Sequence, residues 1–346
     1  MSLRTWISII TFTLVGIIIA FSYEHLVQAW QLLSQVNIWI LLLIIPVNIL
    51  SYIAAGEMIF SYLRAKGAIK HISVPLLVRM SLELNFVNHV LPSGGVSGIS
   101  YMSWRLNKLG ISTGKATMAQ AVRFAAGYAA FITLLAISVL LVTIDGDINR
   151  WIILISCTLV TVMVSATVGV IYLVKSNKRI ERFSKKFSSI TNRLVRRITR
   201  RKANKLLDEE KMLEFFKDMH DDYLELEKDR KVLIKPYLWG LFFTVMEIAL
   251  FFITFLALGK VVNPAPILIA YGVASLAGFI VLTPGGTGAY EALMVFILSL
   301  AGVSQGGAIA GIVLARVLIL IVTIGVGYVF YQLTIMKYGK KPNTST

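Results

Sequence analysis

LPSGGVSG at residues 91–98 and LTPGGTG at residues 282–288 interrupt two apolar stretches of the chain. Each cluster combines a proline with several glycines, and these residue types end helices locally. The segments that follow, 99–108 and 289–301, are too short for a helix to cross the roughly 30 Å hydrocarbon core of a bilayer. Each stretch is therefore predicted to enter a membrane, turn at depth and return to the side from which it came.

The composition around these breaks is that of a membrane protein. Of the 346 residues, 57% are hydrophobic and 15% are charged, and the mean hydropathy is +0.76. This is more apolar surface than a soluble core of that length buries. An all-α polytopic membrane protein with about six full spans and two re-entrant hairpins is predicted. The six apolar runs near the roughly 20 residues of a spanning helix are 6–23, 37–60, 116–143, 151–174, 237–258 and 307–333.

The positive charge of the chain predicts which side of the membrane each loop occupies. The net charge is +16, and residues 175–205 alone hold thirteen Lys or Arg against one acid. Cytoplasmic loops carry the excess of Lys and Arg, so this segment and the loop with Arg105, Lys108 and Lys115 are predicted to lie inside, as are both termini. Nucleic acid is not an expected partner, because aromatic interleaving and a recognition motif are absent.

The order of the predicted elements indicates an internal duplication. Pro92 precedes Arg123 by 31 residues, and Pro284 precedes Arg316 by 32. Inverted repeats with broken helices near the midplane are a recurrent transporter design. The predicted segments are a first span and outer loop (1–36), a first repeat (37–143, hairpin 74–108), a connecting span (144–174), a cytoplasmic basic and amphipathic segment (175–235), a second, inverted repeat (236–336, hairpin 265–301) and a cytoplasmic tail (337–346).

Charged and polar side chains inside these segments form the candidate site. An arginine within a span costs at least about 3 kcal/mol on insertion scales, so Arg123 and Arg316 are predicted to face the bundle interior, although Arg123 could also reach the cytoplasmic interface. Each could pair permanently with an acid, or bind an anionic headgroup in bidentate fashion. The candidate binding or gating residues are Arg123, Arg316, Glu83, Glu291, Asn85, Asn88, Pro92, Gly94, Gly95, Pro284, Gly285, Gly286, Thr287, Gly288 and Tyr290.

Acids that could pair with these arginines lie in the same segments. Glu83 and Glu291 lie in the hairpins, and the spans before the hairpins carry Glu57 and Glu247, which are candidates for ion pairing or proton coupling. If the return helices begin near Ser97 and Thr287, their N-termini offer unpaired N–H groups to a phosphate; alternatively, the glycines only permit close helix crossing.

Metal and cofactor sites are not expected. The four histidines are dispersed, with no pair at ligand spacing on a helix. The single cysteine, Cys157, excludes a disulfide within the chain.

Around PSGG (92–95) and PGGTGAYE (284–291), with Arg123 and Arg316 downstream, the chain resembles the lysylphosphatidylglycerol synthase transmembrane-region family, over about residues 5–335. The resemblance implies re-entrant helices and translocation of phospholipids, as in the flippase half of bacterial multiple-peptide-resistance-factor proteins, and the plasma membrane of a prokaryote. The chain departs from the two-part proteins by ending about ten residues after its last span, so an aminoacyl-transferase domain and lysine transfer are not expected.

The expected function is a flippase that moves phospholipid or lipid-linked anionic molecules between leaflets, with anionic lipids as partners. An enzyme is not expected, because nucleotide-sugar, paired acidic and GxSxG motifs are absent. The alternatives are a component of lipid-linked glycan synthesis, either as an enzyme or an accessory subunit, and a noncatalytic scaffold. A homo-oligomer and a partner membrane enzyme stay open.

Overall fold

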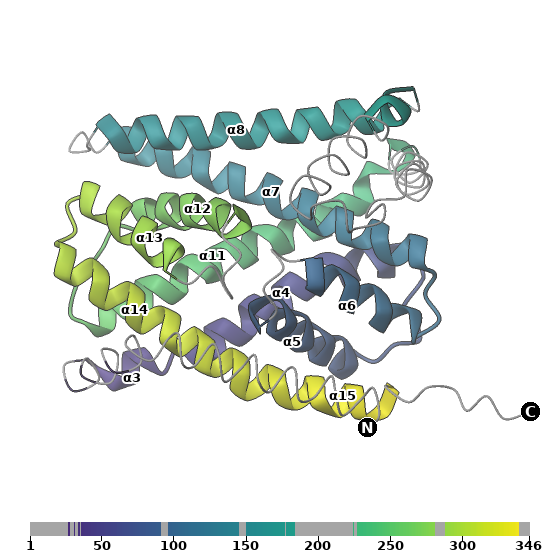
Figure 1. Ribbon diagram of the computed structural model, residues 1–346, viewed down its shortest axis with the longest axis horizontal. Coiled ribbons are helices and arrows are strands. Elements are labelled where there is room, and N and C mark those ends of the chain that lie inside the picture. The colour runs from purple at the N-terminus through teal and green to yellow at the C-terminus, as the bar shows by residue number, and fades with distance from the viewer. Residues whose placement is uncertain are drawn as a thin grey trace, which may run out of the picture. The chain divides into compact units, whose positions relative to one another are not determined.

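The regular elements that the computed structural model describes are all helices (Figure 1). The structure describes residues 36–90, 96–144, 150–176, 178–183, 227–280 and 288–338, together with positions 27, 31, 34 and 224. The chain divides into two compact units, Met1–Val160 with Lys235–Thr346, and Thr161–Ile234. The first unit contains both hairpins and all the candidate site residues.

Four helices are long and apolar enough to cross a bilayer, which confirms an all-helical membrane protein. They correspond to four of the six predicted spans. The ranges are Ile38–Ala65, formed by α3 (Ile38–Leu41) and α4 (Ile44–Ala65); Thr113–Leu140 in α7 (Thr113–Ile144); Arg230–Ala257, formed by η2 (Arg230–Leu233) and α11 (Ile234–Ala257); and Gln305–Tyr338, formed by α14 (Gln305–Val322), η4 (Thr323–Tyr328) and α15 (Val329–Tyr338).

The other two predicted spans have a different status. Residues 6–23 lie outside the described residues. Residues 151–174 form most of α8 (Arg150–Val174), whose apolar stretch Ile153–Gly169 is shorter than the four spans above. The predicted cytoplasmic segment 175–235 and the tail 337–346 are described only in part.

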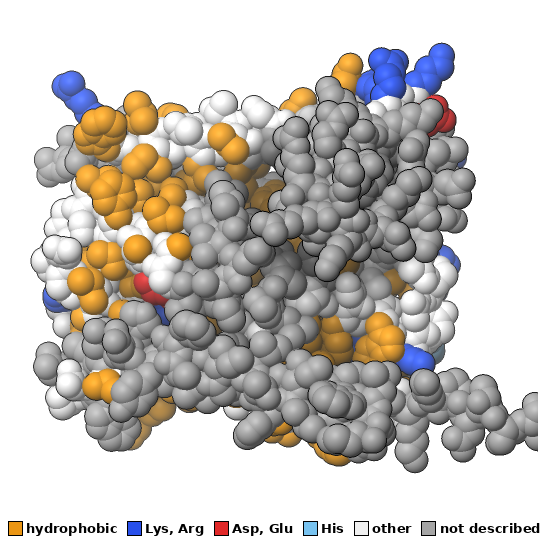
Figure 2. All heavy atoms as spheres, viewed as in Figure 1, with side chains coloured by type: hydrophobic (Ala, Val, Ile, Leu, Met, Phe, Trp, Pro, Cys, Tyr) orange, Lys and Arg blue, Asp and Glu red, His pale blue; other side chains and the backbone are white. Residues whose placement is uncertain are grey.

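Large apolar side chains lie on the surface of these helices, where Figure 2 shows many of them exposed. Trp39 is 78% exposed, Leu140 63% and Leu238 55%. In water such a surface would be an aggregation liability, whereas in lipid it costs nothing. The exposed side chains therefore agree with lipid as the solvent.

The two interrupted stretches form two helical hairpins of matching size. The first consists of α5 (Val74–Val90) and α6 (Val96–Asn107), and the second of α12 (Pro264–Ile280) and α13 (Ala289–Leu300). In both, the entry helix has 17 residues and the return helix 12. At 1.5 Å per residue these helices are about 25 and 18 Å long. The second helix packs against the first in each hairpin.

The hairpins are attached at opposite ends of a parallel helix pair. Asn48 of α4 donates to the Ile319 carbonyl of α14, with 3.4 Å between Nδ2 and O, and one turn further Tyr52 hydrogen-bonds Thr323. The contacts advance together along both helices, so α4 and α14 run in the same direction. Because α5 follows the end of α4 and α13 precedes the start of α14, one hairpin is joined at each end (Figure 1).

Each hairpin also packs on the long helix of the other half, and glycine allows the close approach. α5 crosses η4 at Gly327, where an added Cβ would lie 2.5 Å from the Cβ of Phe86. α12 crosses α7 at Gly272, where an added Cβ would lie 2.3 Å from the Phe131 ring. The two halves of the first unit are thus interlocked, and polar groups from both halves meet between them.

Candidate functional site

Arg316 and Glu291 form an ion pair between α14 and the second hairpin. Arg316 Nε lies 2.9 Å from Glu291 Oε1, and the guanidinium lies 4.4 Å from the centre of the Tyr290 ring. The Arg316 side chain is 19% exposed and that of Glu291 is 10%. Arg316 is the twelfth residue of α14, so it lies about 17 Å along a span that is apolar on both sides of it. An arginine and its carboxylate are therefore held well inside a spanning helix, between apolar stretches.

The second carboxylate oxygen of Glu291 caps its own helix. Gly288 has φ +94°, and its N–H donates to Glu291 Oε2 over 2.7 Å. The helix begins at Ala289, two residues after the predicted start at Thr287. The Gly288 N–H is therefore already satisfied by a carboxylate of the protein and is not open to a phosphate.

A set of polar side chains from both halves of the unit surrounds this ion pair. Glu247 of α11 accepts hydrogen bonds from Ser51 of α4 and from Tyr271 of α12. Ser275 hydrogen-bonds both Tyr271 and Tyr290. We call the whole set the central cluster; its members are Ser51, Tyr52, His89, Glu247, Tyr271, Ser275, Tyr290, Glu291, Arg316 and Thr323.

His89 connects the end of the first hairpin's entry helix to the central cluster. Its ring lies 5.9 Å from that of Tyr52, and its Nδ1 lies 2.8 Å from the carbonyl of Asn85. Both His89 and Tyr52 interact electrostatically with the charge of Arg316. The central cluster thus receives side chains from both hairpins and from α4, α11 and α14.

Arg123 is placed differently from Arg316. It is half-buried on α7, and its guanidinium lies 5.6 Å from the ring of the adjacent Phe124. Among the described residues, the titratable group that interacts electrostatically with Arg123 is Tyr271 of α12. Within the part of the chain that the structure describes, no carboxylate forms an ion pair with Arg123.

The acids that were candidate partners for Arg123 are engaged elsewhere. Glu83 has no exposed surface and lies between two arginines, with 2.8 Å from its Oε1 to Arg79 Nε and 3.4 Å from its Oε2 to Arg105 Nε. Glu57 pairs with Arg64 on its own helix. Neither Glu83 nor Glu57 pairs with Arg123, because closer arginines on α4, α5 and α6 hold both carboxylates.

Arg105 belongs to the surroundings of Glu83 and not to an exposed loop. It lies near the end of α6, within the return segment predicted at 99–108, where it is 1% exposed and stacks 4.7 Å from the centre of the Tyr338 ring. Tyr101 donates to Glu83 Oε2 over 2.8 Å, and Thr334 of α15 donates to Oε1. We call Glu83, Arg79, Arg105, Tyr101 and Thr334 the Glu83 cluster.

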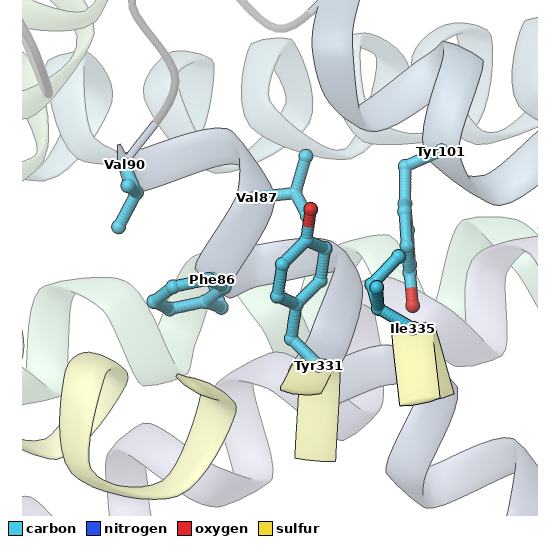
Figure 3. Packing of buried hydrophobic residues seen from close by; sticks show 6 residues of the cluster. All are labelled: Phe86, Val87, Val90, Tyr101, Tyr331 and Ile335. Atoms are coloured by element: carbon cyan, nitrogen blue, oxygen red, sulfur yellow. The ribbon is translucent and has the colours of Figure 1, made fainter. Parts of the chain in front are cut away.

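An apolar layer packs beside the Glu83 cluster (Figure 3). The Tyr331 ring of α15 lies 5.3 Å from Phe86 of α5 and 5.5 Å from Tyr101 of α6. Val87, Val90 and Ile335 complete the layer. The first hairpin is thus fixed to the last helix by hydrogen bonds and aromatic contacts together, which makes Glu83 part of the packing of this hairpin.

The remaining predicted residues fall into two groups. Asn85 donates to the Ser81 carbonyl within α5 over 2.9 Å, whereas the buried Oδ1 of Asn88 has no partner among the described residues. The other group consists of Pro92, Gly94, Gly95, Pro284, Gly285, Gly286 and Thr287, which lie outside the described residues.

Several residues of both clusters were not found by sequence reasoning. Arg79 precedes Glu83 by four residues, a spacing that pairs side chains on a helix and that was visible in the sequence. Thr334 lies 251 residues from Glu83, and Ser51 lies 196 from Glu247. Hydroxyl groups at such separations carry no local pattern, so only the fold reveals them.

The comparison with known families agrees with this architecture. The family described as lysylphosphatidylglycerol synthase TM region matches residues 6–327. The chain belongs to that family. A comparison with curated proteins gives no match. Membership supports a membrane module of a lipid-related protein. Among the described residues, no group of three or more His, Cys, Asp or Glu is arranged to hold a metal ion.

Proposed function

We propose that this member of the lysylphosphatidylglycerol synthase TM region family is a carrier that moves phospholipid or lipid-linked anionic molecules between the leaflets of a membrane. The central cluster is the observation that carries the proposal. It gathers an arginine, two glutamates, three tyrosines and a histidine between apolar helices. Polar groups at such depth are expensive and mark pathways for substrates or ions.

The attachment of the hairpins supports alternating access. The first is joined at the end of α4 and the second at the start of the parallel helix α14. We place them as re-entrant hairpins that enter the membrane from opposite sides, the first from the cytoplasm, with both termini inside and the membrane being the plasma membrane of a prokaryote. Rocking of one half against the other would then expose the central cluster to each side in turn.

An apolar cavity of about 360 Å³ supports a lipid as the transported molecule. Its walls come from α7, α11 and the start of α12, and they include Val245, Ile248 and Phe252. These three repeat every three or four residues on one side of α11, whereas Glu247 is turned by about 200° from Val245. One helix therefore separates an apolar cavity, suited to an acyl chain, from the central cluster, whose polar groups suit the passage of a headgroup.

The test is movement of labelled phosphatidylglycerol in vesicles that contain the purified chain. Arg316→Gln removes the positive charge inside the span and should reduce the rate at least tenfold. Arg64→Gln, which removes an arginine that is paired with Glu57 but 41% exposed, is the matched control and should transport normally. Equal rates for the wild type, Arg316→Gln and empty vesicles would contradict the proposal.

The proposal assigns no chemical reaction to the chain. Incubation of the purified protein with phospholipid and with polyprenyl-linked sugar should return both unchanged by mass spectrometry. Turnover of either lipid without a partner chain would show an enzyme instead.

A further inference from the structure

The two halves of the first unit correspond position by position. α5 and α12 begin 190 residues apart, at Val74 and Pro264, and Glu57 and Glu247 are separated by the same 190. α6 begins 27 residues before Arg123, and α13 begins 27 residues before Arg316. Equivalent residues can therefore be compared across the halves.

At one of these positions the two halves differ in charge. The third residue of α13 is Glu291, which neutralises Arg316, and the third residue of α6 is Gly98. An added Cβ at Gly98 would lie 1.9 Å from Asn88 Oδ1, so the Asn88 amide fills the space next to this glycine. The first half therefore has the arginine without the carboxylate that accompanies it in the second half.

A buried amide next to Arg123 lacks a hydrogen-bond partner among the described residues. Gln120 is 2% exposed, and neither its Nε2 nor its Oε1 has a hydrogen-bond partner among the described residues. It precedes Arg123 by three residues, which places both side chains on one side of α7. A buried amide left unpaired is destabilising, so such a group calls for an explanation.

We infer that Gln120 and Arg123 form a binding site for the phosphate of an anionic lipid headgroup, whereas Arg316 keeps Glu291 as its permanent partner. This inference rests on the proposed function, because the headgroup would be that of the transported lipid. The guanidinium offers two parallel donors to phosphate oxygens, and the Gln120 amide offers a third. A bound phosphate would supply the negative charge that Glu291 supplies in the other half.

Binding is measured directly on the full chain in detergent, by the rise of the melting temperature on titration with short-chain phosphatidylglycerol. Arg123→Gln should raise the apparent Kd for phosphatidylglycerol at least tenfold, and Gln120→Leu should raise it at least threefold. Arg64→Gln is the matched control and should bind as the wild type does. An unchanged Kd in Arg123→Gln would overturn the inference.

Two further titrations identify the source of the phosphate. Short-chain phosphatidylcholine, whose phosphate is balanced by its own choline, should stabilise the wild type less than phosphatidylglycerol does. Inorganic phosphate should stabilise it only at much higher concentration. If inorganic phosphate acts as strongly as phosphatidylglycerol, the site binds free phosphate and the assignment to a lipid fails.

A transplanted carboxylate gives an independent test. Asn88→Ala opens the space beside Gly98, and Gly98→Glu in the same chain then introduces the acid that the second half carries. This double variant should lose phosphatidylglycerol binding, because the new carboxylate occupies Arg123. Asn88→Ala with Gly98→Gln has the same shape without the charge and should retain binding. Equal binding by the two double variants would contradict the inference.

The outcomes separate this site from the proposed function. If the wild type transports lipid and Arg123→Gln binds phosphatidylglycerol normally, the carrier function is supported and the binding site is contradicted. If phosphatidylglycerol binds through Arg123 and no lipid moves in vesicles, the binding site is supported and the carrier function is contradicted.

Discussion

Two glutamates of the first half are paired with arginine, but their surroundings differ. Glu83 has no exposed surface, and its second arginine, Arg105, is 1% exposed. Glu57 pairs with Arg64, whose side chain is 41% exposed, so its guanidinium can also be solvated outside the protein. Because removing one partner of a buried pair leaves the other charge uncompensated, the two carboxylates should differ strongly in their effect on stability.

Glu83→Ala should lower the free energy of unfolding by about 3–5 kcal/mol, since the buried Arg105 guanidinium and the partly exposed Arg79 guanidinium would both lose their carboxylate. Glu57→Ala should lower it by about 1 kcal/mol or less, because Arg64 can turn to solvent or headgroups. Denaturation of both variants in mixed detergent micelles provides the comparison. Similar losses for the two would show that burial of the Glu83 cluster is not what sets its contribution.

At the scale of elements, the crossing of α5 and η4 depends on Gly327. An added Cβ there would meet the Phe86 Cβ at 2.5 Å and the Leu82 carbonyl at 3.1 Å, whereas nothing lies within 4 Å of Gly325 in the same segment. Gly327→Ala should therefore cost about 1–3 kcal/mol through overpacking. Gly325→Ala should be neutral or stabilise the helix by up to about 1 kcal/mol. Thermal unfolding of both variants checks the difference, and equal melting temperatures would contradict this packing.

The helices themselves were predictable from sequence, because apolar length and Pro/Gly breaks are local signals. The return helices were expected at 99–108 and 289–301 and lie at Val96–Asn107 and Ala289–Leu300. The pairing of Arg316 with Glu291 was one of the alternatives that follow from the high cost of a charge inside a span, whereas Arg123 has no carboxylate partner among the described residues. The partners of Glu83 did not follow, because Arg105 lies 22 residues and Thr334 lies 251 residues from Glu83, too far along the chain to form a local pattern.

At the scale of the whole molecule, the proposed orientation predicts which side of the membrane each connection occupies. Lys108 follows α6 and Ser304 precedes α14, and both are exposed. In a Cys157→Ala background, Lys108→Cys should react with a membrane-impermeant maleimide from the cytoplasmic side and Ser304→Cys from the outer side. Labelling of intact cells and of inverted vesicles distinguishes the sides. Reaction of both cysteines from one side would exclude hairpins that enter from opposite faces.

The last span contains a π-helical turn at η4, between residues that serve the two clusters. Thr323 at its start hydrogen-bonds Tyr52, whereas Phe330 and Thr334 beyond it accept hydrogen bonds from Arg79. Deleting one residue of this turn would rotate everything after it by about 100°. The side chains beyond Tyr328 would then point away from Arg79 and Glu83 and lose their hydrogen bonds to them. The residues before the turn would keep their contacts with Tyr52 and the central cluster. The π-helical turn thus sets the rotation of α15 relative to α14, so that one continuous span can present side chains to both clusters.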